Sequence, residues 1–251
     1  MTYTTQVWLW VGFIGMVFGT IVFGAKAIAK RRKEGMEFAL VSFFITLWAA
    51  SLYLSMILGE TVLTDFKGQH EIFWGRYVDW VVTTPLLLLD LGVVAGCRPK
   101  LIGGVIGADI FMILTGLVAT LEGSPTNYLW YVISSGAFLA ILIALFTEFS
   151  DTARRRPAKV NKLYLTLRNV LTVLWIAYPI VWILGPEGFT VLSVGVETAC
   201  YAILDVCAKV GFGLILNGAS SEVLAQASNS HNIMEAVHSY IESEPVRSQN
   251  R

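Results

Sequence analysis

A lysine and an aspartate lie four residues apart in a long apolar segment near the end of the chain. Asp205 and Lys209 are flanked by residues typical of an apolar helix. Residues at positions i and i+4 share one face of a helix. Charges within hydrocarbon are costly, and they are usually found where they face a cavity and carry out a function. The pattern predicts a buried cation at Lys209 that nearby carboxylates compensate.

A second apolar segment contains further ionisable side chains. Arg76 and Asp79 lie three residues apart on one helical face, and Thr83 follows one turn later. Asp90 lies about 16 Å beyond Asp79 along a helix, within a run of leucines. Desolvation favours the neutral form of a carboxyl group. We therefore expect Asp90 to hold a proton at rest, whereas Asp79 and Asp205, near the cation, are expected to be ionised.

The segments that must position these residues are long and apolar. The chain has 251 residues, of which 55% are hydrophobic and only 14% are charged, unlike a soluble domain of this length. A membrane-spanning helix needs roughly 20 apolar residues. Seven segments qualify, covering about residues 7–28, 37–59, 72–96, 101–121, 127–147, 163–184 and 190–217. Short connections make neighbouring helices antiparallel. We predict an all-α membrane protein whose residues 1–218 form one seven-helix bundle.

Basic residues accumulate in alternate connections. The first, third and fifth connections contain clusters of Lys and Arg within residues 26–33, 98–100 and 154–162, whereas the others together contain only Lys67. Lys and Arg are enriched on the cytoplasmic side of membrane proteins. We expect an extracellular N-terminus and a cytoplasmic C-terminus, in a multi-pass protein of the cell membrane.

The remaining residues, 219–251, form a polar segment rich in Ser, Asn, Glu and His. Such a segment buries little apolar area, so a disordered cytoplasmic tail is predicted. A short amphipathic helix is expected from Met234, and His231 and His238 are expected to be solvated. The net charge of zero does not suggest a nucleic-acid partner, and the three cysteines lack the spacing of a metal site.

With this orientation, the ionisable residues are distributed along the bundle axis. Glu187 and Glu197 are expected at the extracellular end, followed inward by Arg76 and then by the acids around Lys209. Asp90 is expected near the cytoplasmic end. This order suits a proton relay. Structural ion pairs are the alternative, but helix packing in lipid does not require so many buried ionisable groups.

Three segments make the chain similar to the microbial (type 1) rhodopsins. They read Arg76-Tyr-Val-Asp79-Trp-Val-Val-Thr83-Thr-Pro-Leu-Leu-Leu-Leu-Asp90, Leu174-Trp175-Ile-Ala-Tyr178-Pro179-Ile-Val-Trp182 and Leu204-Asp205-Val-Cys-Ala-Lys209-Val-Gly-Phe-Gly. The resemblance covers residues 7–217. It implies a light-driven ion transporter rather than an enzyme. All-trans retinal would be bound covalently to Lys209 as a protonated Schiff base, which light isomerises to 13-cis.

The resemblance also implies roles for the ionisable residues. The three-position motif of the family reads Asp79, Thr83 and Asp90 here, as in the bacteriorhodopsin-like outward proton pumps. Asp79 would be the proton acceptor and part of the counter-ion, and Asp205 would be the second counter-ion. Asp90 would be the cytoplasmic proton donor.

Further roles follow for residues on the extracellular side and around the chromophore. Arg76 would move between the counter-ion and a release group formed by Glu187 and Glu197. Tyr53 and Tyr178 would form hydrogen bonds near Asp205. The expected retinal pocket is lined by Trp80, Thr84, Leu87, Met112, Gly116, Ser134, Phe138, Trp175, Tyr178 and Trp182.

Three positions near the expected pocket have other interpretations. Asp109 is expected to form a structural hydrogen bond with Thr84. Tyr131 stands where the haloarchaeal pumps usually have Trp, and Thr46 replaces a proline of the second helix. These departures concern colour and photocycle rates. As partners the resemblance suggests membrane lipid, further copies in a trimer and an accessory carotenoid.

Other functions are less consistent with these residues. A chloride pump would have a neutral residue in place of Asp79, and a sodium pump would have Asn, Asp and Gln at the three motif positions. A ligand-activated seven-helix receptor does not require Lys209 with two acids. The main alternative is a photosensory rhodopsin that signals through a transducer protein, although sensors commonly lack a carboxylate at the position of Asp90.

Overall fold

The structure is a computed structural model, and it describes residues 1–31, 33–64 and 71–228. Within this part, seven helical segments are long and apolar enough to cross a membrane, as the sequence predicts. The elements are α1 (Tyr3–Ala29), α2 (Met36–Ile57), β1 (Leu63–Thr64), β2 (Glu71–Ile72), α3 (Gly75–Ala95), α4 (Pro99–Leu121), α5 (Thr126–Phe146), α6 (Glu148–Ala153), α7 (Ala158–Leu184), α8 (Val194–Asp205), the π-helix η1 (Val206–Gly211) and α9 (Phe212–Gly218).

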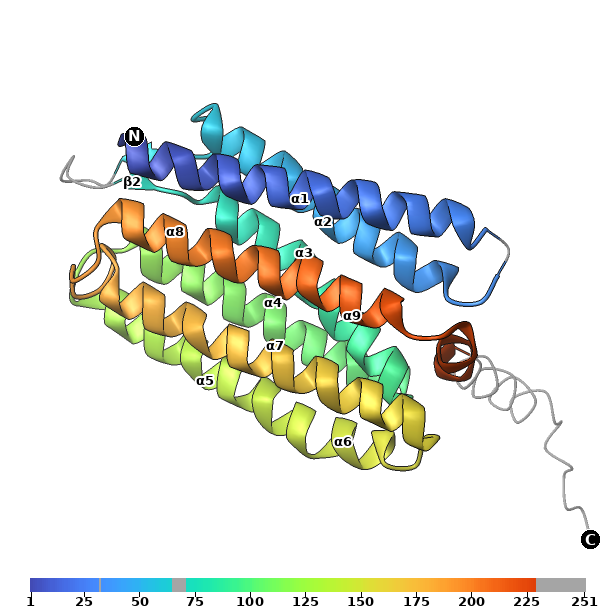
Figure 1. The fold of residues 1–251 in the computed structure, drawn as a ribbon. Helices are drawn as coiled ribbons and strands as arrows, with labels where there is room; N and C mark the ends of the chain where they lie inside the picture. Colours follow the sequence, from blue (N-terminus) through green and yellow to red (C-terminus); the bar gives the residue numbers. More distant parts are fainter. Residues whose placement is uncertain (32, 65–70, 229–251) are drawn as a thin grey trace, which may run out of the picture.

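These elements form one bundle of helices that run side by side (Figure 1). The fifth crossing segment joins α5 to α6, and the seventh joins α8, η1 and α9. The N-terminus lies at one end of the bundle, and the chain leaves the bundle after α9 at the other end (Figure 1). From the charge distribution of the connections, we call these the extracellular and cytoplasmic ends.

The distribution of polar and apolar side chains is that of a protein surrounded by lipid. Ile21 and Val173 are 66% and 71% exposed, whereas Asp79, Asp205 and Lys209 are buried inside the bundle. Apolar side chains lose nothing by facing lipid, but charged ones must face the interior of the bundle. The helices therefore place the ionisable residues along a common internal axis.

One helix boundary and one pair of strands differ from the prediction. Helix α7 begins at Ala158, directly after Pro157, and not near residue 163. Lys159 and Lys162 lie in its first turns, where long basic side chains can extend their charged ends toward water. An antiparallel pair of short strands, in which Leu63 pairs with Ile72, joins α2 to α3 and was not predicted.

The first part of the polar tail is ordered, which corrects the prediction of disorder for the whole segment. Residues 221–228 are helical, and Leu224 and Ala227 are completely buried. They pack against the cytoplasmic core, a cluster of buried apolar side chains that includes Leu88, Leu91, Phe149 and Leu216. Arg156 Nη2 donates hydrogen bonds to the backbone oxygens of Gln226, at 2.5 Å, and Ala227, at 3.1 Å. The predicted helix from Met234, with His231 and His238, lies outside the described residues.

Candidate functional site

Lys209 lies in the π-helix η1, in the middle of the seventh crossing segment. The sequence indicated a continuous α-helix here, because apolar periodicity does not reveal a single wider turn. Single π-turns within α-helices often mark functional sites. The Nζ atom of Lys209 lies 2.6 Å from Asp205 Oδ1 and 2.8 Å from Asp79 Oδ2. All three side chains are buried, so the predicted compensated cation is present in the structure.

The two carboxylates beside Lys209 have unequal surroundings. Asp205 accepts a hydrogen bond from Lys209, and three further donors surround it: Tyr53 at 2.8 Å, Tyr178 at 2.8 Å and the Trp80 indole at 3.1 Å. Hydrogen bonds to an ionised carboxylate stabilise the charged form. The negative charge of Asp205 is therefore strongly stabilised.

Asp79 has fewer donors. Its Oδ1 accepts a long hydrogen bond of 3.3 Å from Thr83, whose hydroxyl also donates to the Asp79 backbone oxygen at 2.9 Å. Its Oδ2 forms the ion pair with Lys209 but has no partner of hydrogen-bond geometry within the described chain. Of the two acids beside the cation, Asp79 therefore holds its negative charge less firmly.

Arg76 is turned toward the extracellular end. Its guanidinium donates to Glu197 at 3.3 Å and to Thr198 at 2.8 Å, and it lies over the rings of Phe73 and Tyr201. Arg76 and Asp79 occupy one face of α3, yet the charged end of Arg76 is paired with α8. Arg76 thus lies between the buried cation and the extracellular acids.

Glu197, which is buried, and Glu187, which is partly buried, form a pair of acids at the extracellular end. A side chain at Gly185 would collide with Glu197 Oε1, because a Cβ there would lie 2.5 Å from it and 3.2 Å from Glu187 Oε2. Burial, and then the neighbouring Glu197, raise the pKa of Glu187 well above its usual value. Because two neighbouring carboxylates repel each other, the pair is expected to keep one proton.

Asp90 is buried in α3 on the cytoplasmic side of the cation. Leu87, Leu88 and Leu91 around it belong to the cytoplasmic core. Its Oδ2 atom has no hydrogen-bond partner among the described residues. An isolated buried carboxylate would be costly, so these surroundings favour a protonated side chain.

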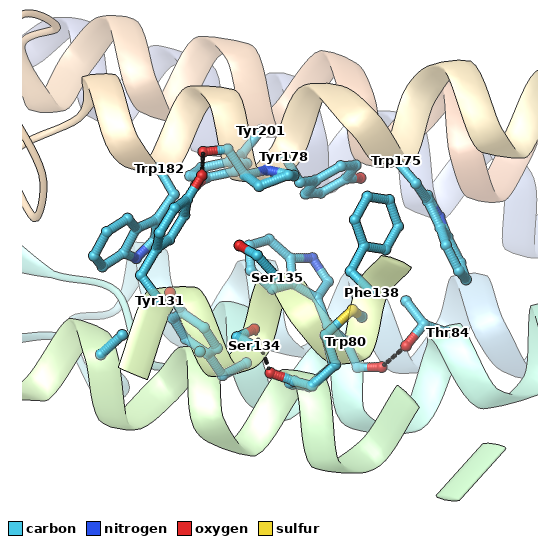
Figure 2. A pocket seen from close by; sticks show the side chains of 16 residues that line it. Trp80, Thr84, Tyr131, Ser134, Ser135, Phe138, Trp175, Tyr178, Trp182 and Tyr201 are labelled. Carbon is cyan, nitrogen blue, oxygen red and sulfur yellow. Dashed lines mark hydrogen bonds between the residues drawn. The ribbon is translucent and has the colours of Figure 1, made fainter. Parts of the chain in front are cut away.

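An apolar cavity lies between the helices beside this site, and Figure 2 shows the side chains that line it. Trp80 and Tyr178 line it and also donate to Asp205, which holds Lys209, so the cavity and the amine share a wall. Trp175 and Trp182 from α7 flank Tyr178 along the cavity, and Phe138 from α5 also lines it (Figure 2). The cavity is thus a slot lined by aromatic rings beside a buried amine.

Most of the predicted pocket residues surround this one cavity. They are Trp80, Thr84, Met112, Gly116, Ser134, Phe138, Trp175, Tyr178 and Trp182. Leu87 is an exception, because it packs into the cytoplasmic core and is not part of the cavity wall. Tyr53 is not on the wall either, and it contacts the site through Asp205.

Two aromatic residues of the wall, Tyr77 and Tyr201, were missed from the sequence, whereas Tyr131 was expected near the pocket and lies on its wall. Tyr77 precedes Trp80 by three residues, and Tyr201 precedes Asp205 by four, so helical spacing alone could have placed both toward the site. Tyr131 stacks on Trp182 with ring centroids 4.9 Å apart. The expected bond between Thr84 and Asp109 is present at 2.7 Å.

Residues 3–222 match the sequence profile of the bacteriorhodopsin-like protein family. The chain belongs to this family. A bacteriorhodopsin from Haloterrigena sp. is 45% identical over 215 residues, which cover 84% of this chain and 86% of that protein. The crystal structure of a cyanorhodopsin from the cyanobacterium Tolypothrix sp. is 67% identical in sequence. It superposes with a TM-score of 0.89, and the match covers 91% of this chain and all of that one.

A further solved relative of this rhodopsin is a light-driven proton pump from Leptosphaeria maculans. It is 32% identical, with a TM-score of 0.82 over 90% of this chain and 98% of that one. Membership of the family implies a retinal chromophore. The structure fits such a group, because a long polyene requires an apolar slot and a covalent link requires an amine beside it. The carboxylates beside Lys209 would balance a cationic link.

Proposed function

We propose that this rhodopsin is a light-driven outward proton pump whose retinal is attached to Lys209. The observation that carries the proposal is the unequal hydrogen bonding of Asp79 and Asp205 around the Lys209 nitrogen. When bound, retinal supplies light absorption and a change of shape. The proton transfers are assigned to the protein's own side chains.

The first proton transfer leads from the Lys209 nitrogen to Asp79. The two atoms lie 2.8 Å apart, which is within reach of direct transfer. Asp205 lies closer, but its charge is stabilised by three donors besides Lys209. A proton displaced from the nitrogen therefore moves to Asp79, and Asp205 remains ionised.

Release to the extracellular side follows from the loss of charge on Asp79. Once Asp79 is neutral, this carboxyl group, which shares a face of α3 with Arg76, no longer attracts the guanidinium. The guanidinium of Arg76, already bonded to Glu197, then favours full ionisation of the acid pair that it faces. The proton held by Glu187 and Glu197 leaves to the extracellular medium.

Reprotonation of the Lys209 nitrogen is assigned to Asp90. It lies on the cytoplasmic side, about 16 Å from Asp79 along α3. A neutral acid in an apolar setting can donate a proton to a basic nitrogen and then be recharged from the cytoplasm. Acceptor and donor thus lie on opposite sides of the nitrogen, which makes net transport outward.

A photosensory function is the alternative. It would require a long-lived activated state and a transducer protein. Asp90 argues for transport, because a resident donor shortens the period in which the nitrogen lacks its proton. The relatives whose names state an activity include light-driven proton pumps from Leptosphaeria maculans and Coccomyxa subellipsoidea.

Assembly into a trimer is a separate part of the proposal. Gly103 and Gly107 on α4 are exposed and lie four residues apart. Small residues at this spacing allow close helix packing in lipid. The molecular mass of the protein in detergent or nanodiscs, measured by light scattering, tests this directly. An accessory carotenoid stays a prediction from the resemblance alone.

The pumping function is tested with cells that carry the chain and are supplied with retinal. Illumination should acidify the unbuffered medium, and a protonophore should abolish the change. Cells carrying Lys209→Ala should show neither a visible absorption band nor a pH response. Alkalinisation, or an acidification that persists with the protonophore, would overturn the proposal.

A further inference from the structure

The hydroxyl of Thr120 joins two aromatic residues of the cavity wall, although Thr120 itself is not part of the wall. Trp182 Nε1 donates to Thr120 Oγ1 at 2.7 Å, and the Tyr77 hydroxyl lies 2.5 Å from the same oxygen. Tyr77, Thr120 and Trp182 come from α3, α4 and α7, and all three are buried. One hydroxyl group thus connects three helices behind the cavity.

This use of a threonine differs from that of other threonines in the bundle. Thr83 and Thr115 donate to the backbone oxygen four residues earlier in their own helices. Such bonds satisfy the hydroxyl locally and tie no helices together. Thr120 lies in the last turn of α4, and its bonds lead to the side chains of neighbouring helices.

The two residues held by Thr120 lie between the cavity and the extracellular acids. Tyr77 and Trp182 both line the cavity, and Tyr77 also packs edge-on against Trp80, with ring centroids 5.1 Å apart. The backbone oxygen of Trp182 accepts a hydrogen bond from Gly185, the residue that lies against Glu187 and Glu197. A displacement of Trp182 would therefore also move Gly185 and change its contacts with Glu187 and Glu197.

The hydrogen-bonding capacity of the three side chains shows that Thr120 must be the acceptor for Trp182. An indole N–H can only donate, so Trp182 occupies one lone pair of Thr120. The other bond joins the hydroxyl groups of Thr120 and Tyr77, and either group can be its donor. Without the Thr120 oxygen, the buried N–H of Trp182 loses its acceptor. A buried donor without a partner moves to find one, or remains at a cost in free energy.

We propose that Thr120 is a positioning residue that fixes Trp182 and Tyr77 around the chromophore and couples movement of this wall to extracellular proton release. The proposal rests on the proposed proton pump. It does not make Thr120 part of the proton path, because the expected route runs through Asp79, Arg76 and the acid pair. Its role is to hold the wall in one arrangement at rest.

The test compares Thr120→Val, which keeps the shape but removes the hydroxyl, with Thr120→Ser, which keeps the hydroxyl. Thr115→Val is the matched control, because Thr115 is equally buried on α4 and bonds only to its own helix. Light-minus-dark infrared spectra report the indole N–H of Trp182, and a pH-sensitive dye reports the delay between deprotonation of the Lys209 nitrogen and proton release.

In Thr120→Val, the indole band should move to the frequency of a weaker hydrogen bond, and the release delay should change by roughly fivefold, which corresponds to about 1 kcal/mol in a barrier. Thr120→Ser and Thr115→Val should resemble the wild type. An unchanged band and delay in Thr120→Val would overturn the proposal. If Thr120→Val does not bind retinal, Tyr77→Phe serves instead, and an unchanged delay in that variant overturns it. Absence of pumping in the wild type would count against the pump itself.

Discussion

Asp79 and Asp205 flank one nitrogen, but Asp205 is surrounded by donors while Asp79 is not. Asp205 has Tyr53, Tyr178 and Trp80 as donors besides Lys209, whereas Oδ2 of Asp79 has only its ion pair with Lys209 in the described chain. In a low-dielectric interior, such donors decide which of two acids keeps its charge. The geometry thus separates a permanent counter-ion from a proton acceptor.

Replacement of Asp79 by Asn should abolish transport and shift the absorption band to longer wavelength. The neutral amide removes one of the two negative charges beside the Lys209 nitrogen. The resting state then loses more stabilisation than the excited state, and the energy gap between them narrows. Absorption spectra and light-induced pH changes measure both effects. Transport that persists in Asp79→Asn would show that another group accepts the proton.

Removal of the Tyr53 hydroxyl should weaken the distinction between the two acids. Tyr53→Phe deprives ionised Asp205 of a buried hydrogen bond, which is worth about 1.5–3 kcal/mol for a charged group. Asp205 then becomes a stronger base, so the fraction of molecules in which the displaced proton reaches Asp79 should fall. Flash-induced infrared difference spectra measure this fraction.

Tyr164→Phe is the control for this experiment. Tyr164 is a buried tyrosine whose hydroxyl donates to the backbone oxygen of Leu145, far from the cation. It should leave the fraction of protons that reach Asp79 unchanged. An equal fraction in Tyr53→Phe and the wild type would contradict the assignment of Asp205 as the acid whose charge its donors preserve.

Replacement of Asp90 by Asn should leave the colour nearly unchanged and slow reprotonation of the Lys209 nitrogen. Asp90 lies away from the cation, so its loss alters the photocycle only at the step that it serves. Added azide, a small diffusible proton carrier, should restore the rate. Asp109→Asn, which alters another buried carboxyl, is expected to leave this step unchanged. A normal decay in Asp90→Asn would remove it from the role of donor.

Release to the extracellular side should depend on pH through Glu187. Because its pKa is raised by burial and by Glu197, the folded protein keeps a proton here at pH values where the unfolded chain has lost it. Early release after a flash should therefore decline as the pH rises through the raised pKa of Glu187, because the resting pair is then already ionised. A pH-sensitive dye measures the amplitude.

Glu187→Gln should eliminate early release at every pH. It should also remove a contribution to pH-dependent stability. Between the usual and the raised pKa of Glu187, the native state binds more protons than the unfolded state, so its contribution to stability falls as pH rises. Early release of wild-type amplitude in Glu187→Gln would show that a different group supplies the proton.

Much of the fold and of the central site could be predicted because both follow from local spacing and hydrophobicity. The i, i+4 relation of Asp205 and Lys209 survives in the structure even though the turn between them is a π-turn. Long apolar segments and the alternation of basic connections were enough to predict the seven-helix bundle.

The features that could not be predicted depend on contacts between helices. The bonds of Thr120 with Tyr77 and Trp182 join residues that are 43 and 62 positions away in sequence. The packing of Leu224 and Ala227 on the cytoplasmic core depends on a surface that only the assembled bundle provides. Leu87, which the family resemblance placed in the pocket, lies one turn beyond Thr84 and packs into the cytoplasmic core instead.

The most direct measurement of the central claim is the infrared C=O band that appears when the Lys209 nitrogen loses its proton. In protein labelled with ¹³C at the aspartate carboxyl groups, the band should shift to lower frequency. In Asp79→Glu it should remain but no longer respond to the label, because the newly protonated acid is then a glutamate. A label-sensitive band in Asp79→Glu would place the proton on another aspartate, such as Asp205, and would contradict the account.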